Sequence, residues 1–467
     1  MTITAHRTAD EIGRTTVGPR PLPPLGATRE VPLPDVLDVT LTNGLRVLAA
    51  RNPRVPMAEL RLRVPFAPDA AELDLAETDD TAISRHLAAA ELLTATLLTG
   101  TATRDRVTID DELAAVGADL GVVVDPERLL VSGSGLAAGL PDVLGVLADV
   151  LTAATHPDAE VARERDRLVE RITVARAQPR TIAREALQRK RFGDHPITRE
   201  MPTEAAVSAV TAEQVRGLQR ASLVPRGSIL TLVGDVDPAA AIADVEKFLE
   251  GWTAEHAARE LLPPPPIIAD DLELVHRPGS VQSQLRLTAP AVGRADPAYA
   301  ALQLANLVFG GYFSSRWMEN IREDKGYTYG AHSGVEFVPG GGVLGLETDV
   351  ASDVTAAALL ETRYELGRLV AVPPTAAEVD AARAYAIGSL AISLDSQGGL
   401  ASSINAMAAV GLTLDWLRSY PARLSAVTPD EVAAAALRFF GPSAVTGVVV
   451  GDASVIGPAL RALGGVA

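Results

Sequence analysis

Four consecutive prolines, at residues 263–266, divide this chain and limit what can fold around them. Proline lacks a backbone N–H and has a fixed φ, so such a run is excluded from helix interiors and central strands. We expect an extended spacer instead. At 467 residues the chain also exceeds what one hydrophobic core usually supports. The sequence therefore predicts domains at 31–258 and 271–467, a proline-rich linker at 259–270, and a flexible lead at 1–30.

The two predicted domains repeat one another. In each, an apolar strand ends in a Gly-Asp turn and leads into a helix, at Ser228–Leu249 and again at Val445–Leu463. Both halves also open with strand patterns, the first with an Asn43-Gly44 hairpin turn. A repeat this long is no solenoid, so the predicted fold class is α+β, with two homologous α/β-sandwich domains in tandem. Longer helices are expected at 80–98, 158–177, 298–309 and 376–391.

Charge and composition limit which binding partners, cysteine chemistries and cellular locations are expected for this chain. The net charge of −17 argues against nucleic acid and anionic membranes as partners. Acidity can attract basic peptides, although it is also a plain solubility device. The chain has no cysteine, which excludes disulfides, thiolate zinc sites and cysteine nucleophiles. Because the N-terminus lacks an apolar signal region and no 18-residue apolar run exists, we expect a cytoplasmic protein.

Local motifs for metal or phosphate are missing. No two of the seven histidines lie within five residues of each other, so no helical zinc motif exists. His86 is expected to be a packed or helix-surface histidine. No phosphate-binding P-loop and no Gly-x-Ser-x-Gly nucleophile elbow is present. Gly340-Gly341-Gly342 predicts a tight turn between strands, since a phosphate cradle needs a following helix N-terminus.

Aromatic residues are scarce, at 4% of the chain, yet one short segment concentrates them. Six fall between residues 309 and 329: Phe309, Tyr312, Phe313, Trp317, Tyr327 and Tyr329. Gly326 is expected to end a helix there, so that Tyr329 starts the next strand and folds back beside Arg322. A guanidinium and a phenol together can hold a peptide carbonyl or stabilise an oxyanion. The alternative is a solvent-exposed helix-end arginine and a tyrosine that caps the sheet.

The segment Phe309–Arg316, followed by Ile321–Tyr329, resembles the second domain of the pitrilysin and mitochondrial-processing-peptidase family of zinc peptidases. Order and spacing agree across about residues 36–460. Further family-like stretches are Leu41–Val47, Leu97–Thr101, His195-Pro196 and the Gly-Asp turns at Gly234 and Gly451. The candidate substrate-binding residues in this segment are Gly310, Gly311, Phe313, Ser315 and Tyr327. The resemblance implies a duplicated half of a peptidase clamshell.

The first half departs from that family. Catalytic members carry His-x-x-Glu-His about six residues before a Gly-Thr, and here those positions run from Glu91 through Thr94 to Ala95. The third ligand position falls at Arg171, or at Glu170 if the register slips by one. Ala95 has no donor atom, Thr94 cannot act as a general base near neutral pH, and an arginine repels a cation. The sequence therefore predicts no metal and no cofactor in this chain.

In contrast to the zinc-motif positions of the first half, functional positions of the family are kept in the second half. The resemblance implies that Arg322 and Tyr329 correspond to the family's substrate-orienting pair. The predicted protein is then a zinc-free subunit, inactive alone, of a heterodimeric metalloendopeptidase. Its homologous partner would hold zinc on an intact His-x-x-Glu-His motif, and this chain would bind the peptide as an added strand. The alternatives are a structural or assembly subunit and a free-standing hydrolase with an unfamiliar site. In that family, the mitochondrial non-catalytic subunit has a longer glycine-rich loop before the Ser-Arg segment. Here only Gly310-Gly311 remain, so the way in which that subunit binds presequences is not carried over to this chain.

Overall fold

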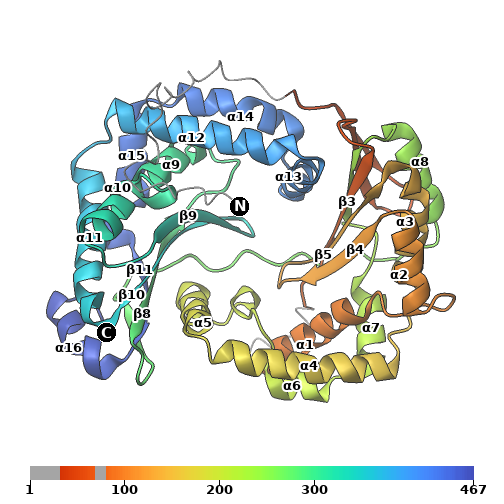
Figure 1. Ribbon diagram of the computed structural model, residues 1–467, viewed down its shortest axis with the longest axis horizontal. Helices are drawn as coiled ribbons and strands as arrows, with labels where there is room; N and C mark the ends of the chain where they lie inside the picture. Colours follow the sequence, from red (N-terminus) through yellow and green to blue (C-terminus); the bar gives the residue numbers. More distant parts are fainter. Residues whose placement is uncertain (1–31, 69–79) are drawn as a thin grey trace, which may run out of the picture. The chain divides into compact units, whose positions relative to one another are not determined.

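The computed structural model describes residues 32–68 and 80–467, of which Leu33–Ala467 form one compact unit. The flexible lead predicted at 1–30 lies outside the described residues. Two mixed sheets, each faced by helices, make up the fold (Figure 1). The predicted α+β class with two α/β sandwiches in tandem is confirmed.

The first sheet has six strands in the order β1-β2-β6-β3-β5-β4. Their bounds are β1 (Val36–Thr40), β2 (Arg46–Arg51), β3 (Met57–Pro65), β4 (Asp119–Val124), β5 (Arg128–Leu136) and β6 (Ile229–Gly234). All six residues of β6 are buried, as the apolar run before its Gly-Asp turn predicts. The Asn43-Gly44 hairpin is also confirmed. Gly44 has φ +90°, a conformation that favours glycine.

The second sheet has five strands in the order β7-β11-β8-β10-β9. Their bounds are β7 (Glu273–His276), β8 (Gln282–Ala291), β9 (Ala331–Val338), β10 (Gly341–Ala351) and β11 (Thr446–Gly451). The fully buried β11 is the counterpart of β6. The predicted turn at Gly340–Gly342 joins β9 to β10, and Gly340 has φ +78°. Both strand–Gly-Asp–helix units therefore form as the sequence predicts.

Helices flank both sheets. Those of the first half are α1 (Asp80–Thr96), α2 (Arg106–Ala115), α3 (Leu140–Ala153), α4 (Asp158–Arg176), α5 (Pro179–Phe192), α6 (Glu204–Ala209), α7 (Ala212–Ser222) and α8 (Pro238–Phe248). Those of the second half are α9 (Tyr299–Asn306), α10 (Arg316–Met318), α11 (Thr355–Ala371), α12 (Ala376–Asp395), α13 (Gln397–Ala409), α14 (Leu414–Ala426), α15 (Pro429–Phe439) and α16 (Ala453–Leu463). Capping boxes at Thr211, Thr375 and Thr428 fix where α7, α12 and α15 begin.

The helix predicted at 298–309 is only partly right. α9 ends at Asn306, and the chain continues as a wider π-helical turn, Leu307–Gly311. A Cβ on Gly310 would lie 2.8 Å from Ser333 Oγ and 2.9 Å from the Trp317 ring, so only glycine allows this close approach. Neither the turn nor this contact shows in the apolar periodicity.

Two helices cross between the halves. α5, from the first half by sequence, packs on β8 and β11 of the second sheet, while α13 packs on β3 and β6 of the first. Arg191 of α5 donates to Thr288 Oγ1 (2.9 Å) and Glu336 (2.7 Å). Asn405 of α13 donates to Thr231 Oγ1 (3.1 Å). Packing therefore does not follow the boundaries at 258 and 271 that the proline run suggests.

The proline-rich segment lies against the body of the protein. Leu261 and Ile267, on either side of the four prolines, are buried, and Ile267 packs with Phe192 and Val343. The linker is therefore anchored at both ends. Within the described ranges no single helix is long and apolar enough to cross a membrane. α13 and α14 meet that length and composition only as a pair, with a 99° bend between them.

Candidate functional site

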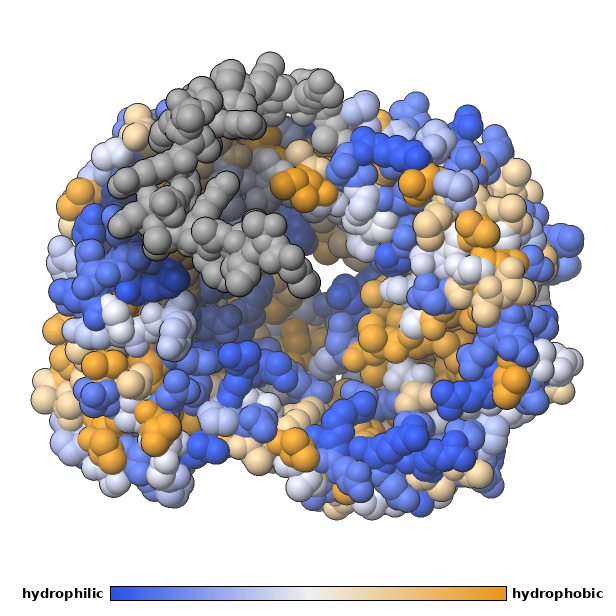
Figure 2. All heavy atoms as spheres, viewed as in Figure 1, coloured by the Kyte–Doolittle hydropathy of each residue, from blue (hydrophilic) through white to orange (hydrophobic). Residues whose placement is uncertain are grey.

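The positions that resemble the zinc motif lie where α1 meets α4. Glu91, Thr94 and Ala95 are on α1, and Arg171 is on α4. Arg171 Nη2 is 3.1 Å from Glu91 Oε2, so the two side chains form an ion pair between the helices. Burial raises the pKa of the Glu91 carboxyl, and the charge of Arg171 partly offsets that rise. Further hydrophilic side chains gather over α4 and α6 in the lower right of Figure 2.

This donor set does not fit zinc. Glu91 offers one carboxylate, but it is already paired with a cation. The Thr94 hydroxyl donates to the Glu91 carbonyl of its own helix (2.8 Å), and Ala95 has no donor atom. His86, five residues before Glu91, packs with its Nε2 3.2 Å from the Phe66 carbonyl, as expected of a packed histidine. Across residues 32–68 and 80–467, no group of three His, Cys, Asp or Glu is placed to hold a metal ion.

Arg322 lies on a second π-helical turn, Glu319–Asp324. Its Nη1 is 2.5 Å from Glu323 Oε1, and its Cζ lies 4.6 Å from the centre of the Phe313 ring. Phe313 is 61% exposed. Arg322 and Phe313 therefore form a cation–π pair on the surface, a contact that sequence spacing did not predict.

Tyr329 projects fully into solvent. Gly326, with φ +67°, ends the helical segment as predicted, and the Tyr327 N–H donates to the Ile321 carbonyl (2.9 Å). Tyr329 itself does not start the next strand, because β9 begins two residues later, at Ala331. Its side chain is 97% exposed and makes no hydrogen bond within the part of the chain that is described. The phenol is thus available to a ligand.

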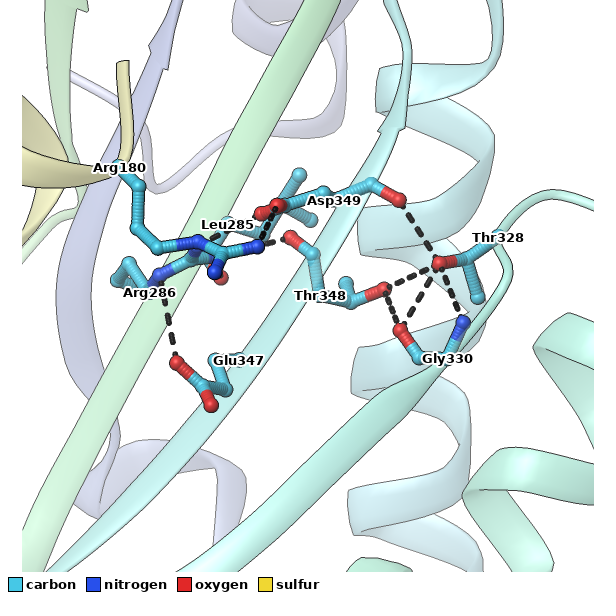
Figure 3. Close-up of polar contacts among 8 residues, drawn as sticks. All are labelled: Arg180, Leu285, Arg286, Thr328, Gly330, Glu347, Thr348 and Asp349. Carbon is cyan, nitrogen blue, oxygen red and sulfur yellow. Dashed lines mark hydrogen bonds and ion pairs between the residues drawn. The ribbon is translucent and has the colours of Figure 1, made fainter. Parts of the chain in front are cut away.

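The backbone on both sides of Tyr329 is held firmly (Figure 3). Thr328 Oγ1 donates to the Asp349 carbonyl (2.8 Å) and accepts from the Gly330 N–H (3.1 Å). Thr348 Oγ1 donates to the Gly330 carbonyl (3.0 Å). We call Thr328, Gly330, Thr348 and Asp349 the Thr328 network. It fixes the residues before and after Tyr329 while leaving the side chain free.

A buried arginine supports the Thr328 network from within the sheet. Arg286 on β8 donates to the Thr348 carbonyl (3.1 Å) and to Asp349 Oδ1 (2.7 Å), and Arg180 of α5 lies 3.6 Å from Asp349 Oδ2 (Figure 3). Sequence reasoning missed all of these residues. Their only signal is the pairing of β9 with β10, which places Thr348 opposite Ala331. That pairing cannot be read from local periodicity.

The other candidate binding residues differ in exposure. Gly310 and Ser315 are buried, Gly311 and Tyr327 are half-buried, and Phe313 is exposed. Gly310 packs against Ser333 and Trp317, which gives it a structural role. Ser315 precedes α10, and its hydroxyl has no partner within the described residues. Only Phe313 among the five presents most of its side chain to solvent beside Arg322.

Comparisons with known proteins bear on this arrangement. Residues 87–203 match the family described as insulinase (peptidase family M16), and residues 209–385 match the peptidase M16 inactive domain. The chain belongs to the M16 peptidase family. The family resemblance predicted from the aromatic segment is thereby confirmed. The two matches lie on either side of residues 204–208 and cover more than half of the chain.

Individual proteins are also similar to this chain. An uncharacterized zinc protease of Streptomyces coelicolor is 26% identical over 352 residues, 74% of this chain and 76% of its own. The human cytochrome b-c1 complex subunit 1 is 25% identical over 219 residues, 46% of this chain and 45% of its own. The crystal structure of a peptidase M16 inactive domain from Pseudomonas fluorescens superposes with a TM-score of 0.78 at 24% identity, over 89% of this chain and 98% of that one. This last similarity shows the fold alone.

Proposed function

We propose that this M16 chain is the non-catalytic subunit of a heterodimeric metalloendopeptidase. A homologous partner with an intact His-x-x-Glu-His motif supplies the zinc. This chain binds the peptide and presents Arg322 and Tyr329 to the scissile carbonyl. Their N–H and O–H groups donate hydrogen bonds to the carbonyl oxygen, where negative charge develops as the bond is attacked. The cytoplasmic location predicted from the sequence remains part of the proposal.

One observation carries the proposal: the hydroxyl of Tyr329 is exposed and unpaired, while the Thr328 network fixes the backbone around it. A donor that serves a ligand benefits from this combination, because ordering the backbone on binding would otherwise cost conformational entropy. Arg322 is restrained as well, by Glu323 and Phe313. The zinc-motif positions support a complex in which the partner alone holds zinc, since Glu91 and Arg171 of this chain form an ion pair with each other.

A free strand edge suits the expected peptide. β4 pairs with β5 on one side, and no other described strand pairs with its second side. Val123 on β4 is 61% exposed. An extended peptide can add to such an edge through main-chain hydrogen bonds, with its side chains alternating between the two faces. We therefore assign peptide binding to the outer edge of β4.

A structural or assembly role is the second candidate. It is favoured by the similarity to human cytochrome b-c1 complex subunit 1, which matches just under half of this chain. In that case the exposed Tyr329 would have no role in peptide hydrolysis. The two candidates predict different partners, so the proteins that accompany the chain distinguish them.

The test begins with the chain purified from its native host under gentle conditions. Co-purification of a His-x-x-Glu-His homologue, with peptidase activity that neither subunit shows alone, is the expected result. Association with a membrane complex and no peptidase would instead indicate the structural role. Chelator-resistant activity of the isolated chain would indicate a free-standing hydrolase. In the reconstituted pair, Arg322→Ala should assemble normally and turn over substrate far more slowly.

A further inference from the structure

A cavity of about 450 Å³ lies among α9, α12, α13 and α14. α9, α12 and α14 lie side by side in Figure 1. The cavity falls within the roughly 300–1,000 Å³ typical of small-ligand sites. Its lining combines aromatic and aliphatic side chains with serine hydroxyls, including those of Ser389 and Ser403. It does not include Arg322, Tyr329 or the α1–α4 contact.

Three aromatic rings form one wall of this cavity. Tyr420 stacks on Trp416 with ring centres 4.6 Å apart and on Tyr299 at 5.6 Å. All three side chains are more than nine-tenths buried. Such a wall holds an apolar or aromatic group by area and by ring contacts.

Three residues that line the cavity, Gln303, Trp416 and Tyr420, each have a buried polar side-chain atom with no hydrogen-bond partner within the described residues. The Trp416 Nε1 donor and the Gln303 Oε1 acceptor are both out of contact with solvent, and neither has a hydrogen-bond partner within the described residues. An unpaired buried polar atom costs about 1–3 kcal/mol, so such atoms usually await a partner. A ligand here should therefore offer both an acceptor and a donor.

The guanidinium group of Arg294 lies at the edge of the cavity. The Cζ of Arg294 lies 3.5 Å from the centre of the Phe337 ring, and no described carboxylate lies within ion-pair distance of it. Burial raises the pKa of the neighbouring phenols Tyr299 and Tyr420, so they supply no negative charge near neutral pH. No described carboxylate therefore offsets the charge of the guanidinium, whose polar neighbour is the Tyr299 phenol. Arg294 and Ala406 also line a larger cavity of about 970 Å³.

We propose that this cavity binds an N-acylated amino-acid carboxylate with an apolar side chain, as found at the C-terminus of a peptide. Arg294 holds the carboxylate, and the side chain packs on the wall of Tyr299, Trp416 and Tyr420. The amide N–H donates to Gln303 Oε1, and Trp416 Nε1 donates to a ligand carbonyl. The same chemistry is offered by a free N-acyl amino acid, so the source is decided by experiment.

The test is calorimetric titration of the full chain alone, so its outcome does not depend on whether a peptidase partner exists. The probes are N-acetyl-phenylalanine, its primary amide, and a tripeptide that ends in phenylalanine, with either a free or an amidated C-terminus. We expect both acids to bind and both amides to bind roughly 10- to 100-fold more weakly, because the amides lose a charge-assisted contact. Binding of N-acetyl-phenylalanine without the tripeptide would assign the site to a free acid.

Variants identify the residues. Arg294→Gln should abolish the preference for acids over amides, and Trp416→Phe should weaken all probes while keeping an aromatic ring. Arg438→Gln is the matched control, because Arg438 stacks on Phe439 at 4.6 Å and does not line this cavity. Equal affinity for acid and amide in the wild-type chain, or no binding of any probe, would overturn the proposal even if Arg294→Gln failed to fold.

Discussion

The polar side chains at the α1–α4 contact are paired with each other, whereas the Tyr329 segment carries an unpaired one. At the first, Glu91 and Arg171 from two helices neutralise each other 3.1 Å apart. At the second, the backbone is tied down by the Thr328 network while the phenol remains unpaired. Groups that serve only the fold find partners inside it. A donor that has no partner inside the fold, on a backbone that is already fixed, is available to a peptide carbonyl.

Restoring metal ligands should have the largest effect. Glu91→His, Thr94→Glu, Ala95→His and Arg171→Glu together place two histidines four residues apart on α1 and a carboxylate opposite them on α4. Because Arg171 already contacts residue 91, we expect about one zinc per chain, measured by elemental analysis after gel filtration.

The triple variant that keeps Arg171 is the control, and it should bind zinc much more weakly because the guanidinium repels the cation. A folded quadruple variant without zinc would show that the helices no longer hold the geometry of a metal site.

Removing one hydroxyl should have the next largest effect. In the reconstituted complex, Tyr329→Phe should lower kcat by roughly 10²–10³ with little change in KM, because the donor acts on the charge that develops during attack. Steady-state kinetics measures this. Tyr364→Phe, at another exposed tyrosine (56% exposed), should leave both constants unchanged. Near-normal turnover by Tyr329→Phe would remove the proposed role.

Loosening the Thr328 network should cost less. Thr328→Val removes its hydrogen bonds to Asp349 and Gly330. We expect about a tenfold loss of kcat, because the free energy lost from positioning Tyr329 should be about that of one hydrogen bond. The loss should vanish in a Tyr329→Phe background if Thr328 acts through Tyr329. Thr152→Val, on the surface of α3, is the control. Additive losses in the double variant would separate Thr328 from Tyr329.

The smallest effect concerns the ionisation of Glu91. Its pKa is raised in the folded chain, so the folded state binds the proton more tightly than the unfolded state does. The contribution of Glu91 to stability is therefore fully present below its unfolded pKa and is lost as pH rises through its folded pKa.

Arg171→Ala should raise the pKa of Glu91 further, because the charge that opposes burial is gone. Carboxyl titration by ¹³C NMR measures both values. A fall in the pKa of Glu91 in this variant would contradict the assigned balance between burial and Arg171.

Local patterns predicted many elements because those elements depend on nearby residues. The Gly-Asp turns, the Asn43-Gly44 hairpin and the end of the helix at Gly326 follow from backbone preferences within a few positions. The packing of α5 and α13 on the opposite sheets depends on contacts between distant parts of the chain. No periodicity within either helix encodes which sheet it covers.

The candidate site, like the fold, was predictable where it depends on nearby residues and was not predictable where it depends on distant ones. The family resemblance pointed to Glu91 and to Arg171 or Glu170 as former zinc-ligand positions, and sequence spacing put Arg322 and Tyr329 on one segment. Neither could show that Ser315 is buried, that Phe313 lies under Arg322, or that Thr348 and Asp349 of β10 hold the backbone around Tyr329. Those facts depend on strand pairing and on the wider π turns, where the chain departs from regular helix.

We propose that this chain keeps donors for a peptide carbonyl and holds no metal of its own. The most direct test is the zinc content of the wild-type chain, purified alone, equilibrated with excess zinc and desalted. We expect clearly substoichiometric zinc and no peptidase activity until a zinc-bearing homologue is added. One tightly bound zinc per chain, with proteolysis that rises and falls with it, would contradict this proposal.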